Sequence, residues 1–122
     1  MSRIIEVVAA VIWQDDKFLI CQRPANKKQN PLQWEFPGGK VEEGESDEAA
    51  LEREILEEFN TVVSIGKKIA ETPIDNELIL KLYKCTHRLG NYVLRDHSES
   101  AWVDKLEDMY QFGLAPADKR LL

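Results

Sequence analysis

Residues 39–59 read GKVEEGESDEAALEREILEEF and form the most informative part of the chain. From Glu42 to Glu58 this acidic segment holds nine acids and one base, Arg53. A helix with this charge repels itself unless a cation offsets the carboxylates. A hard divalent cation with oxygen ligands can do so, and Mg²⁺ commonly shares its coordination with substrate phosphates. The segment therefore predicts an acidic helix that binds a metal.

The apolar side chains of the segment predict which face of the helix packs on the core. They recur every four residues, at Leu51, Ile55 and Phe59. Glu54, Glu57 and Glu58 cover the adjoining arc, within reach of one another. An acidic face that only aids solubility is the alternative, but such a face lies opposite the core. Carboxylates beside an apolar stripe are costly unless they are paired, which favours the metal.

Both ends of the helix carry local signals. Ser46 is a good N-cap, and Asp47 and Glu48 in the first turn complement the helix dipole. After Phe59 comes Asn60, a residue second to Gly for the left-handed position that ends a helix. We predict a helix capped by Ser46 that runs to about Phe59.

The rest of the chain is rich in β-strand patterns. We predict strands over 4–13, 18–23, 34–36, 62–70, 77–88, 92–95 and 101–103, with the first two joined as a hairpin. A helical turn is predicted over 105–110 and a short helix over 116–122, while Pro37, Gly38 and Gly39 are expected to interrupt the chain. This order predicts a mixed α/β fold in a single domain, 1–122, whose strands lie too close in sequence for a Rossmann pattern.

Charge and composition exclude several classes of protein. The net charge of −6 disfavours binding to a nucleic acid polymer. No apolar run approaches the roughly 20 residues that span a bilayer, and Glu6 lies too near the start for a secretory signal. Cys21 and Cys85 stand in apolar, strand-like contexts and are predicted to be buried, reduced thiols. We therefore expect a cytoplasmic protein without a membrane partner.

The spacing within the acidic segment resembles a known motif, the Nudix box, Gly-x5-Glu-x7-Arg-Glu-(aliphatic)-x-Glu-Glu-x-Gly-(aliphatic). The matching positions are Gly39, Glu45, Arg53, Glu54, Ile55, Glu57 and Glu58. Asn60 and Thr61 stand where the family has Gly and an aliphatic residue. Asn tolerates the same backbone conformation as Gly. All the charged positions of the box are intact.

The resemblance extends over nearly the whole chain. Residues 34–40, WEFPGGK, and 114–118, LAPAD, are similar to the MutT-type branch of the Nudix family. The fold that this resemblance implies is the Nudix α/β/α sandwich around a mixed β-sheet.

The resemblance also implies roles for the residues of the box. The expected ligands of Mg²⁺ or Mn²⁺ are Glu54, Glu57, Glu58 and the carbonyl of Gly39. Glu54 is also the expected general base, which Arg53 would orient. Glu45 is expected to form a salt bridge or to support the ligands without binding the metal itself.

Other residues are assigned by resemblance outside the box. The family often adds an acid from a loop before a late strand, and here Asp96 or Glu99 would supply it. Arg23 matches a position that contacts substrate phosphate, and Asp118 stands where the base is read. Phe36 could stack on a base or belong to the core. An ordinary structural role remains the alternative for each of these residues.

The implied activity is the divalent-metal-dependent hydrolysis of a nucleoside triphosphate to a monophosphate and pyrophosphate. An oxidised purine nucleotide such as 8-oxo-dGTP is the favoured substrate, which would place the protein in sanitation of the nucleotide pool and so in DNA repair. CTP or a 5-modified pyrimidine triphosphate is the close alternative. A non-catalytic Nudix-like module that binds nucleotides is more distant, because such modules usually lack some of the carboxylates. The sequence leaves open whether the chain is a monomer or a homodimer.

Overall fold

The computed structural model describes residues 4–26, 31–73, 77–95, 97 and 99–105. The elements are β1 (Ile5–Gln14), β2 (Lys17–Gln22), β3 (Trp34–Glu35), β4 (Gly38–Lys40), α1 (Asp47–Phe59), β5 (Val62–Pro73), β6 (Leu78–Leu89) and β7 (Glu99–Val103). The predicted helix over 116–122, all of the predicted helical turn except residue 105, Asp96 and Asp118 lie outside the described residues.

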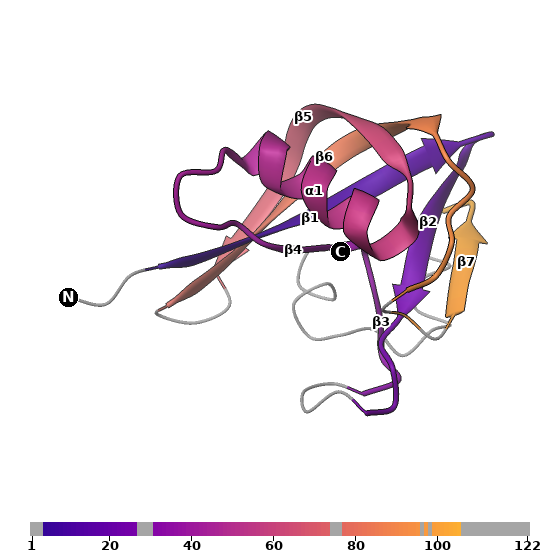
Figure 1. The fold of residues 1–122 in the computed structure, drawn as a ribbon, viewed down its shortest axis with the longest axis horizontal. Helices are drawn as coiled ribbons and strands as arrows, with labels where there is room; N and C mark the ends of the chain where they lie inside the picture. The colour runs from indigo at the N-terminus through magenta and orange to yellow at the C-terminus, as the bar shows by residue number, and fades with distance from the viewer. Residues whose placement is uncertain (1–3, 27–30, 74–76, 96, 98, 106–122) are drawn as a thin grey trace.

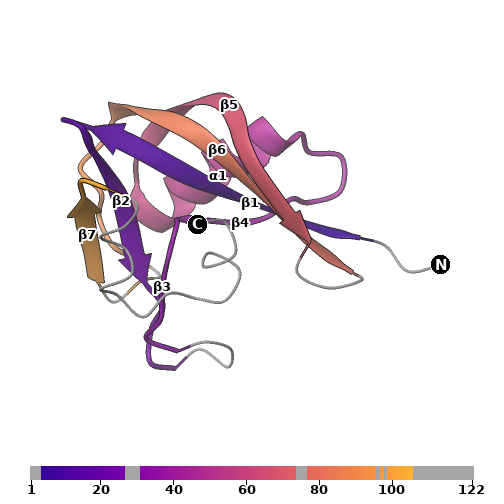
Figure 2. The same cartoon turned by 180° about the vertical axis from the view of Figure 1, so that it is seen from behind.

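The strands form one mixed sheet in the order β3-β2-β1-β6-β5 (Figure 1). β1 and β6 run parallel, from the pair Ile5 and Leu78 onward, and the other pairs are antiparallel. The second edge of β1 is divided, because β4 pairs with Val7–Ala9 and β2 with its last two residues. β7 pairs with β2, and the part of the sheet made by β2, β3 and β7 turns away from the direction of β1, β6 and β5 (Figure 2).

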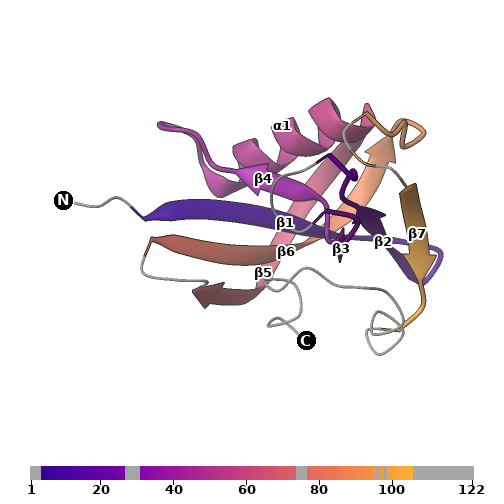
Figure 3. The ribbon, with the colours of Figure 1, turned by 90° about the horizontal axis from the view of Figure 1, so that it is seen from below.

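The core is divided by the sheet into two layers. Along β1 the side chains alternate, so Val8, Ala10 and Ile12 pack with α1, whereas Ala9 and Val11 join the cluster on the opposite face. Figure 3 shows α1 covering one face of the sheet. The predicted apolar stripe of the helix is confirmed, because Leu51, Ile55 and Phe59 are fully buried in the first cluster.

The two predicted ends of α1 are also confirmed. The Ser46 hydroxyl accepts a hydrogen bond from the amide of Ala49 at 3.1 Å. Asn60 adopts the left-handed conformation, with φ 54° and ψ 39°, and its amide donates to the carbonyl of Leu56 at 2.9 Å. Local capping chemistry thus fixes the length of the acidic helix.

The expected interruption of the chain at Pro37–Gly39 is wrong in part, because Gly38 and Gly39 belong to β4. They pair with Ala9 and Val8 of β1. A Cβ on Gly38 would overlap the backbone of Val8, and one on Gly39 would overlap the Glu54 carboxylate. These glycines permit close packing on both sides of a strand, a use that the sequence alone does not separate from a turn.

The predicted strand over 92–95 is also wrong, because that segment is irregular. The amide of Val93 donates to the carbonyl of Phe59 at 2.8 Å, and the amide of Arg95 to that of Glu58 at 3.0 Å. The backbone of this segment therefore satisfies carbonyls at the end of α1 instead of joining the sheet.

The remaining expectations differ from the structure mainly at the boundaries. β5 runs on to Pro73, and β7 begins two residues earlier than predicted, at Glu99. Cys21 and Cys85, the two cysteines of the chain, are both buried and form no disulfide, as predicted. Among the described residues, α1 is too short and too polar to cross a bilayer.

Candidate active site

The guanidinium of Arg53 joins α1 to the loop that follows β4. Its Nε donates to Glu45 Oε2 at 2.7 Å, and its Nη2 donates to Glu45 Oε1 at 3.0 Å. Nη2 also donates to the carbonyl of Lys40 at 3.1 Å. The hydrogen bonds from Arg53 lower the pKa of Glu45 to about 2, and those to Glu45 raise the pKa of Arg53. The bidentate pair fixes the orientation of Arg53.

The same guanidinium also contacts three further carboxylates. Nη1 donates to Glu54 Oε1 at 2.9 Å and to Glu57 Oε2 at 3.3 Å, and it lies 3.8 Å from Glu42 Oε1. We call the set Arg53, Glu42, Glu45, Glu54 and Glu57 the Arg53 cluster. It opposes four carboxylates with one cation, so it keeps a surplus of negative charge.

Glu54 lies in an environment that changes the pKa of its carboxyl group. Its side chain is only 16 % exposed, and its carboxylate lies against Gly39, where a Cβ would overlap it. Burial raises the pKa of Glu54, although the hydrogen bond from Arg53 opposes that change. A carboxyl group with a raised pKa is better matched to proton transfer near neutral pH.

Glu57 and Glu58 differ sharply from each other in burial. Glu58 is 9 % exposed and lies against the core, while the side chain of Glu57 is 60 % exposed. Of the carboxylates predicted to lie beside the apolar stripe, Glu58 does so, whereas Glu57 is mostly exposed to solvent.

The structure places Glu54, Glu57 and Glu58 on one helix but does not gather their oxygens into a closed cage. Among the described residues, three ligand atoms approach within 4.8 Å of one another at a single place, formed by Cys21, Glu35 and His97. Glu54 and Glu57 are instead held by Arg53. Their oxygen chemistry, the surplus of negative charge and the close approach of Gly39 nevertheless fit a hard divalent cation.

The segment before β7 lies against the C-terminal end of α1. Arg95 donates from its backbone to the carbonyl of Glu58 at 3.0 Å and from Nη1 to the carbonyl of Glu57 at 3.4 Å. Glu99 is exposed at the start of β7, where it pairs with Gln22. Asp96 lies outside the described residues, so the loop acid stays a prediction for both candidates.

Two predicted substrate contacts can be located. Arg23 follows β2, and its Nη1 is ion-paired with Glu35 Oε1 at 2.9 Å. Phe36 is 3 % exposed and packs in the second core cluster, with its ring centroid 6.0 Å from that of Phe18. Phe36 thus takes the core position that the sequence left as its alternative, and Asp118 lies outside the described residues.

A second ionic network, missed by sequence reasoning, fixes the first turn of α1. Lys81 Nζ binds Glu6 Oε1 at 2.6 Å and Asp47 Oδ2 at 3.0 Å. The Tyr83 hydroxyl donates to the same Asp47 oxygen at 2.6 Å. We call these four residues the Lys81 network. The sequence gives only a weak signal for this network, a lysine inside an apolar strand. Its partners can be identified only once the pairing of β1 with β6 is known.

The loop of the acidic segment also borders a hollow of about 440 Å³. Its lining residues are Ile4, Ile5, Glu6, Lys40, Val41, Glu42, Glu43, Gly44 and Glu45. A hollow of about 500 Å³ is lined by residues such as His87, Tyr92 and Trp102, and none of the predicted site residues line it. Proximity to the Arg53 cluster therefore favours the smaller hollow as the one related to the site.

The model of the NUDIX domain family matches residues 4–121, so the chain belongs to the Nudix family. The fold and the acidic helix agree with this class of protein. Among its relatives, the CTP pyrophosphohydrolase of Escherichia coli strain K12 is 39 % identical over 98 % of this chain and 90 % of its own length. A putative 8-oxo-dGTP diphosphatase 2 of Mycobacterium tuberculosis is 33 % identical over 93 % of this chain and 82 % of its own. The solution structure of the E. coli ORF135 protein superposes with a TM-score of 0.80, at 37 % identity, covering 98 % of this chain and 86 % of that one.

These likenesses confirm the family and the fold that the motif predicted. The described residues contribute a mixed sheet with one helix on one face. Nudix hydrolases generally use divalent metals, which agrees with the excess of carboxylates around Arg53.

Proposed function

We propose that this chain is a nucleoside triphosphate pyrophosphohydrolase that releases a nucleoside monophosphate and pyrophosphate. The observation that carries the proposal is the Glu54 carboxylate, which is held by Arg53 and pressed against the backbone of Gly39. A largely buried carboxylate with a raised pKa, in a region with a surplus of negative charge, is suited to accept a proton from an attacking water.

In this proposal each residue of the Arg53 cluster has a distinct task. Glu54 takes the proton of the water, and Arg53 keeps one Glu54 oxygen in a fixed direction. Glu45 orients Arg53 through its bidentate pair. The side chains of Glu45, Arg53 and Glu54 are all less than a quarter exposed. Rigid support of this kind keeps a catalytic group in position.

The cation in this proposal is Mg²⁺, with Mn²⁺ as a substitute. Glu54, Glu57, Glu58 and the Gly39 carbonyl would hold it, with an acid of the loop before β7, Asp96 or Glu99, as a further ligand. When bound, it offsets the negative charge that a triphosphate brings to an acidic helix. Glu54 and Glu57 would exchange part of their contact with Arg53 for the cation.

Two nucleotides are candidate substrates, and each has a relative to support it. The E. coli relative, 39 % identical, is called a CTP pyrophosphohydrolase, which favours CTP or a 5-modified pyrimidine triphosphate. The 33 % identical M. tuberculosis relative favours the oxidised purine that the motif first suggested, 8-oxo-dGTP. The base would be read by Asp118, whose carboxylate accepts hydrogen bonds from cytosine N4 or from guanine N1 and N2.

The test is a hydrolysis panel with CTP, 5-methyl-dCTP, 8-oxo-dGTP, dGTP and ADP-ribose in Mg²⁺, with products separated by anion exchange. The proposal expects monophosphate and pyrophosphate from a triphosphate, with the highest kcat/KM on either the cytosine nucleotides or 8-oxo-dGTP. A kcat/KM on ADP-ribose comparable to that on the triphosphates would contradict the proposal that the substrate is a nucleoside triphosphate. A nucleoside diphosphate and inorganic phosphate as products would contradict the proposed release of monophosphate and pyrophosphate.

The proposal also covers the setting of the enzyme. A small nucleotide is its partner, in the cytoplasm, where the nucleotide pool lies. The acidic surface, with a net charge of −6, supports a role on free nucleotides and not on nucleic acid polymers.

A further inference from the structure

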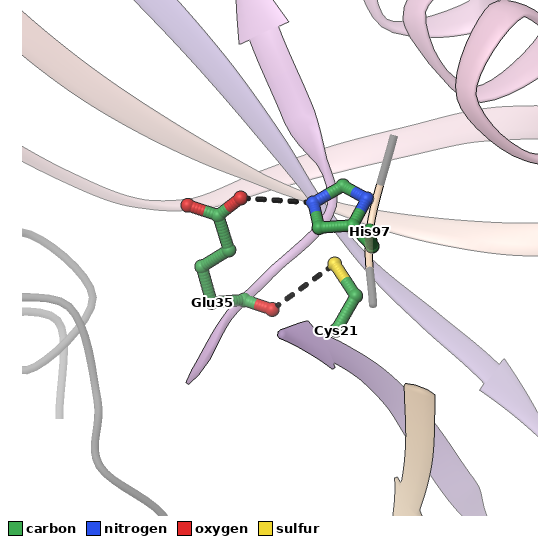
Figure 4. Close-up of side chains that lie close together, drawn as sticks. All are labelled: Cys21, Glu35 and His97. Carbon is green, nitrogen blue, oxygen red and sulfur yellow. Dashed lines mark hydrogen bonds and ion pairs between the residues drawn. The ribbon is translucent and has the colours of Figure 1, made fainter. Parts of the chain in front are cut away.

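Three side chains of different chemistry converge at the junction of β2, β3 and the segment before β7. Cys21 Sγ, one Glu35 carboxylate oxygen and one His97 ring nitrogen all lie within 4.8 Å of one another. Figure 4 shows the His97 ring and the Glu35 carboxylate facing each other above the Cys21 sulfur. None of the three belongs to the Arg53 cluster.

The fold fixes each member of this Cys21–Glu35–His97 cluster. Cys21 and Glu35 are direct partners in the pairing of β2 with β3, so their side chains leave the sheet on the same face. His97 Nε2 lies 3.0 Å from Glu35 Oε2. The His97 ring stacks on that of Phe59 at the end of α1, with centroids 5.4 Å apart and planes 9° from parallel.

His97 is buried between Glu35 and the end of α1. Its side chain is only 4 % exposed. Nδ1 is buried without a hydrogen-bond partner among the residues that the structure describes. Nε2, the nitrogen that faces Glu35, is therefore the ring atom placed to bind a metal together with that carboxylate.

We propose that Cys21, Glu35 and His97 form a binding site for a borderline transition-metal cation of the Zn²⁺ class. Thiolate, imidazole and carboxylate are the three ligand types that Zn²⁺ uses in proteins. Tetrahedral coordination by these atoms requires them to be about 3.3–3.6 Å apart. The three atoms lie within 4.8 Å of one another, and Nε2 is 3.0 Å from Oε2. Side-chain shifts of up to about 1 Å would therefore bring them to tetrahedral distances. A fourth position is left for water.

The charges of the cluster suit a divalent cation. A Cys21 thiolate and the Glu35 carboxylate together balance two positive charges. Arg23 binds Glu35 Oε1 at 2.9 Å, and a metal bound to Oε2 would replace the hydrogen bond between Oε2 and His97 Nε2. Binding replaces the thiol proton, which is released to solvent. Nε2 gives up the proton that it donates to Glu35 Oε2, and the neutral His97 ring then carries its proton on Nδ1 while Nε2 binds the metal.

The two metal chemistries of the chain are separate. The Arg53 cluster and its neighbours offer only oxygen, which suits Mg²⁺ and Mn²⁺. A thiolate selects softer cations and is not a Mg²⁺ ligand. Saturation of the acidic helix with Mg²⁺ therefore leaves the Cys21–Glu35–His97 cluster available to a softer metal.

The test uses Co²⁺, whose bond to a thiolate gives a charge-transfer absorption band in the near ultraviolet. Purified full-length protein is reduced, stripped of metal with a chelator, saturated with Mg²⁺ and titrated with Co²⁺. The same titration is run on Cys21→Ser, on His97→Gln and on Cys85→Ser, which removes the other buried thiol as a matched control. Circular dichroism establishes that each variant is folded.

The proposal expects one Co²⁺ per chain with the thiolate band in the wild type and in Cys85→Ser. Cys21→Ser is expected to lose the band, and His97→Gln to bind at least tenfold more weakly. Zn²⁺ is expected to displace Co²⁺ and to raise the Tm of the wild type but not of Cys21→Ser. A wild type without the band, or a band that persists in Cys21→Ser, overturns the site. If Cys21→Ser does not fold, undiminished affinity in His97→Gln overturns it.

Discussion

Arg53 and Lys81 each gather acidic side chains around α1, yet the two regions differ in charge balance. Lys81 binds two carboxylates, and a tyrosine hydroxyl shares one of them. Arg53 contacts four carboxylates. The Lys81 network, with one cation against two carboxylates, keeps a smaller surplus of negative charge and can anchor the helix by itself. The Arg53 cluster holds more negative charge than the fold can neutralise, and this surplus is what distinguishes a candidate metal site from a structural salt bridge.

The largest effect is expected from Glu54→Gln, which removes the proposed base while keeping the shape of the side chain. We expect kcat to fall by about 10²–10⁴-fold, with the same circular dichroism spectrum as the wild type. The assay is pyrophosphate release in saturating Mg²⁺. Glu52→Gln, an exposed site on the same helix, is the control and should retain activity. Full activity in Glu54→Gln would remove Glu54 from the chemistry.

A smaller effect is expected from Gly39→Ala. The new Cβ would overlap the Glu54 carboxylate, which lies at the end of a flexible side chain and can move aside. We therefore expect kcat/KM to fall by roughly 10–100-fold, with little change in Tm. Lys40→Ala keeps the backbone carbonyl that accepts from Arg53 and serves as the control. Equal losses in both variants would mean that the Gly39 contact has no special importance.

Lys81→Met tests the other side of the comparison. It leaves the Asp47 and Glu6 carboxylates without their cation, and the side chain of Lys81 is only 14 % exposed. After allowance for solvent screening, we expect the free energy of unfolding to fall by about 1–2 kcal/mol. Urea denaturation measures it, with the exposed Lys84→Met of the same strand as the control. The kcat/KM of folded Lys81→Met should stay near that of the wild type, and a selective loss of catalysis would contradict a purely structural network.

Metal removal compares the two regions directly. Mg²⁺ at ten times its Kd should stabilise the wild type by about 1.4 kcal/mol, so that EDTA lowers Tm by a few degrees. Lys81→Met should show the same shift, because its network does not bind the metal. Glu54→Gln should show much less. Equal shifts in all three proteins would indicate that Mg²⁺ binds elsewhere.

The smallest effect concerns pH. Burial tends to raise the pKa of Asp47, but the hydrogen bonds from Tyr83 and Lys81 outweigh it and lower that pKa. A carboxylate with a lowered pKa stabilises the fold above its unfolded pKa and loses this contribution as the pH falls through the folded value. The difference in the free energy of unfolding between pH 7 and pH 3 should therefore be smaller in Asp47→Asn than in the wild type. Glu48→Gln, its exposed neighbour, should leave that difference unchanged.

The parts that the sequence predicted well depend on neighbours along the chain. The ends of α1 follow from Ser46 and Asn60, and its buried stripe from the spacing of three apolar residues. Arg53 could be placed beside Glu57 because residues four apart meet on a helix.

The parts that it missed depend on which strands pair. Glu35 gains Arg23 and His97 as partners only once β3 lies beside β2. Lys81 of β6 likewise meets Asp47 only once α1 packs on the sheet. The glycines of β4 look like a turn until β1 supplies a partner, and residues 92–95 look like a strand until the carbonyls of α1 accept their amides.

The parallel pairing of β1 with β6 has a consequence for how the chain folds. Ile5 pairs with Leu78 and Trp13 with Thr86, so the central contact of the sheet joins residues far apart in sequence. Such a contact cannot form until most of the chain has been synthesised. Its formation then costs loop-closure entropy, and folds with distant contacts form slowly. During synthesis, β1, a strand rich in Val and Ala, must wait for β6 to emerge from the ribosome. Before then, the strands that can pair with β1 are β2, which forms a hairpin with it, and the short strand β4.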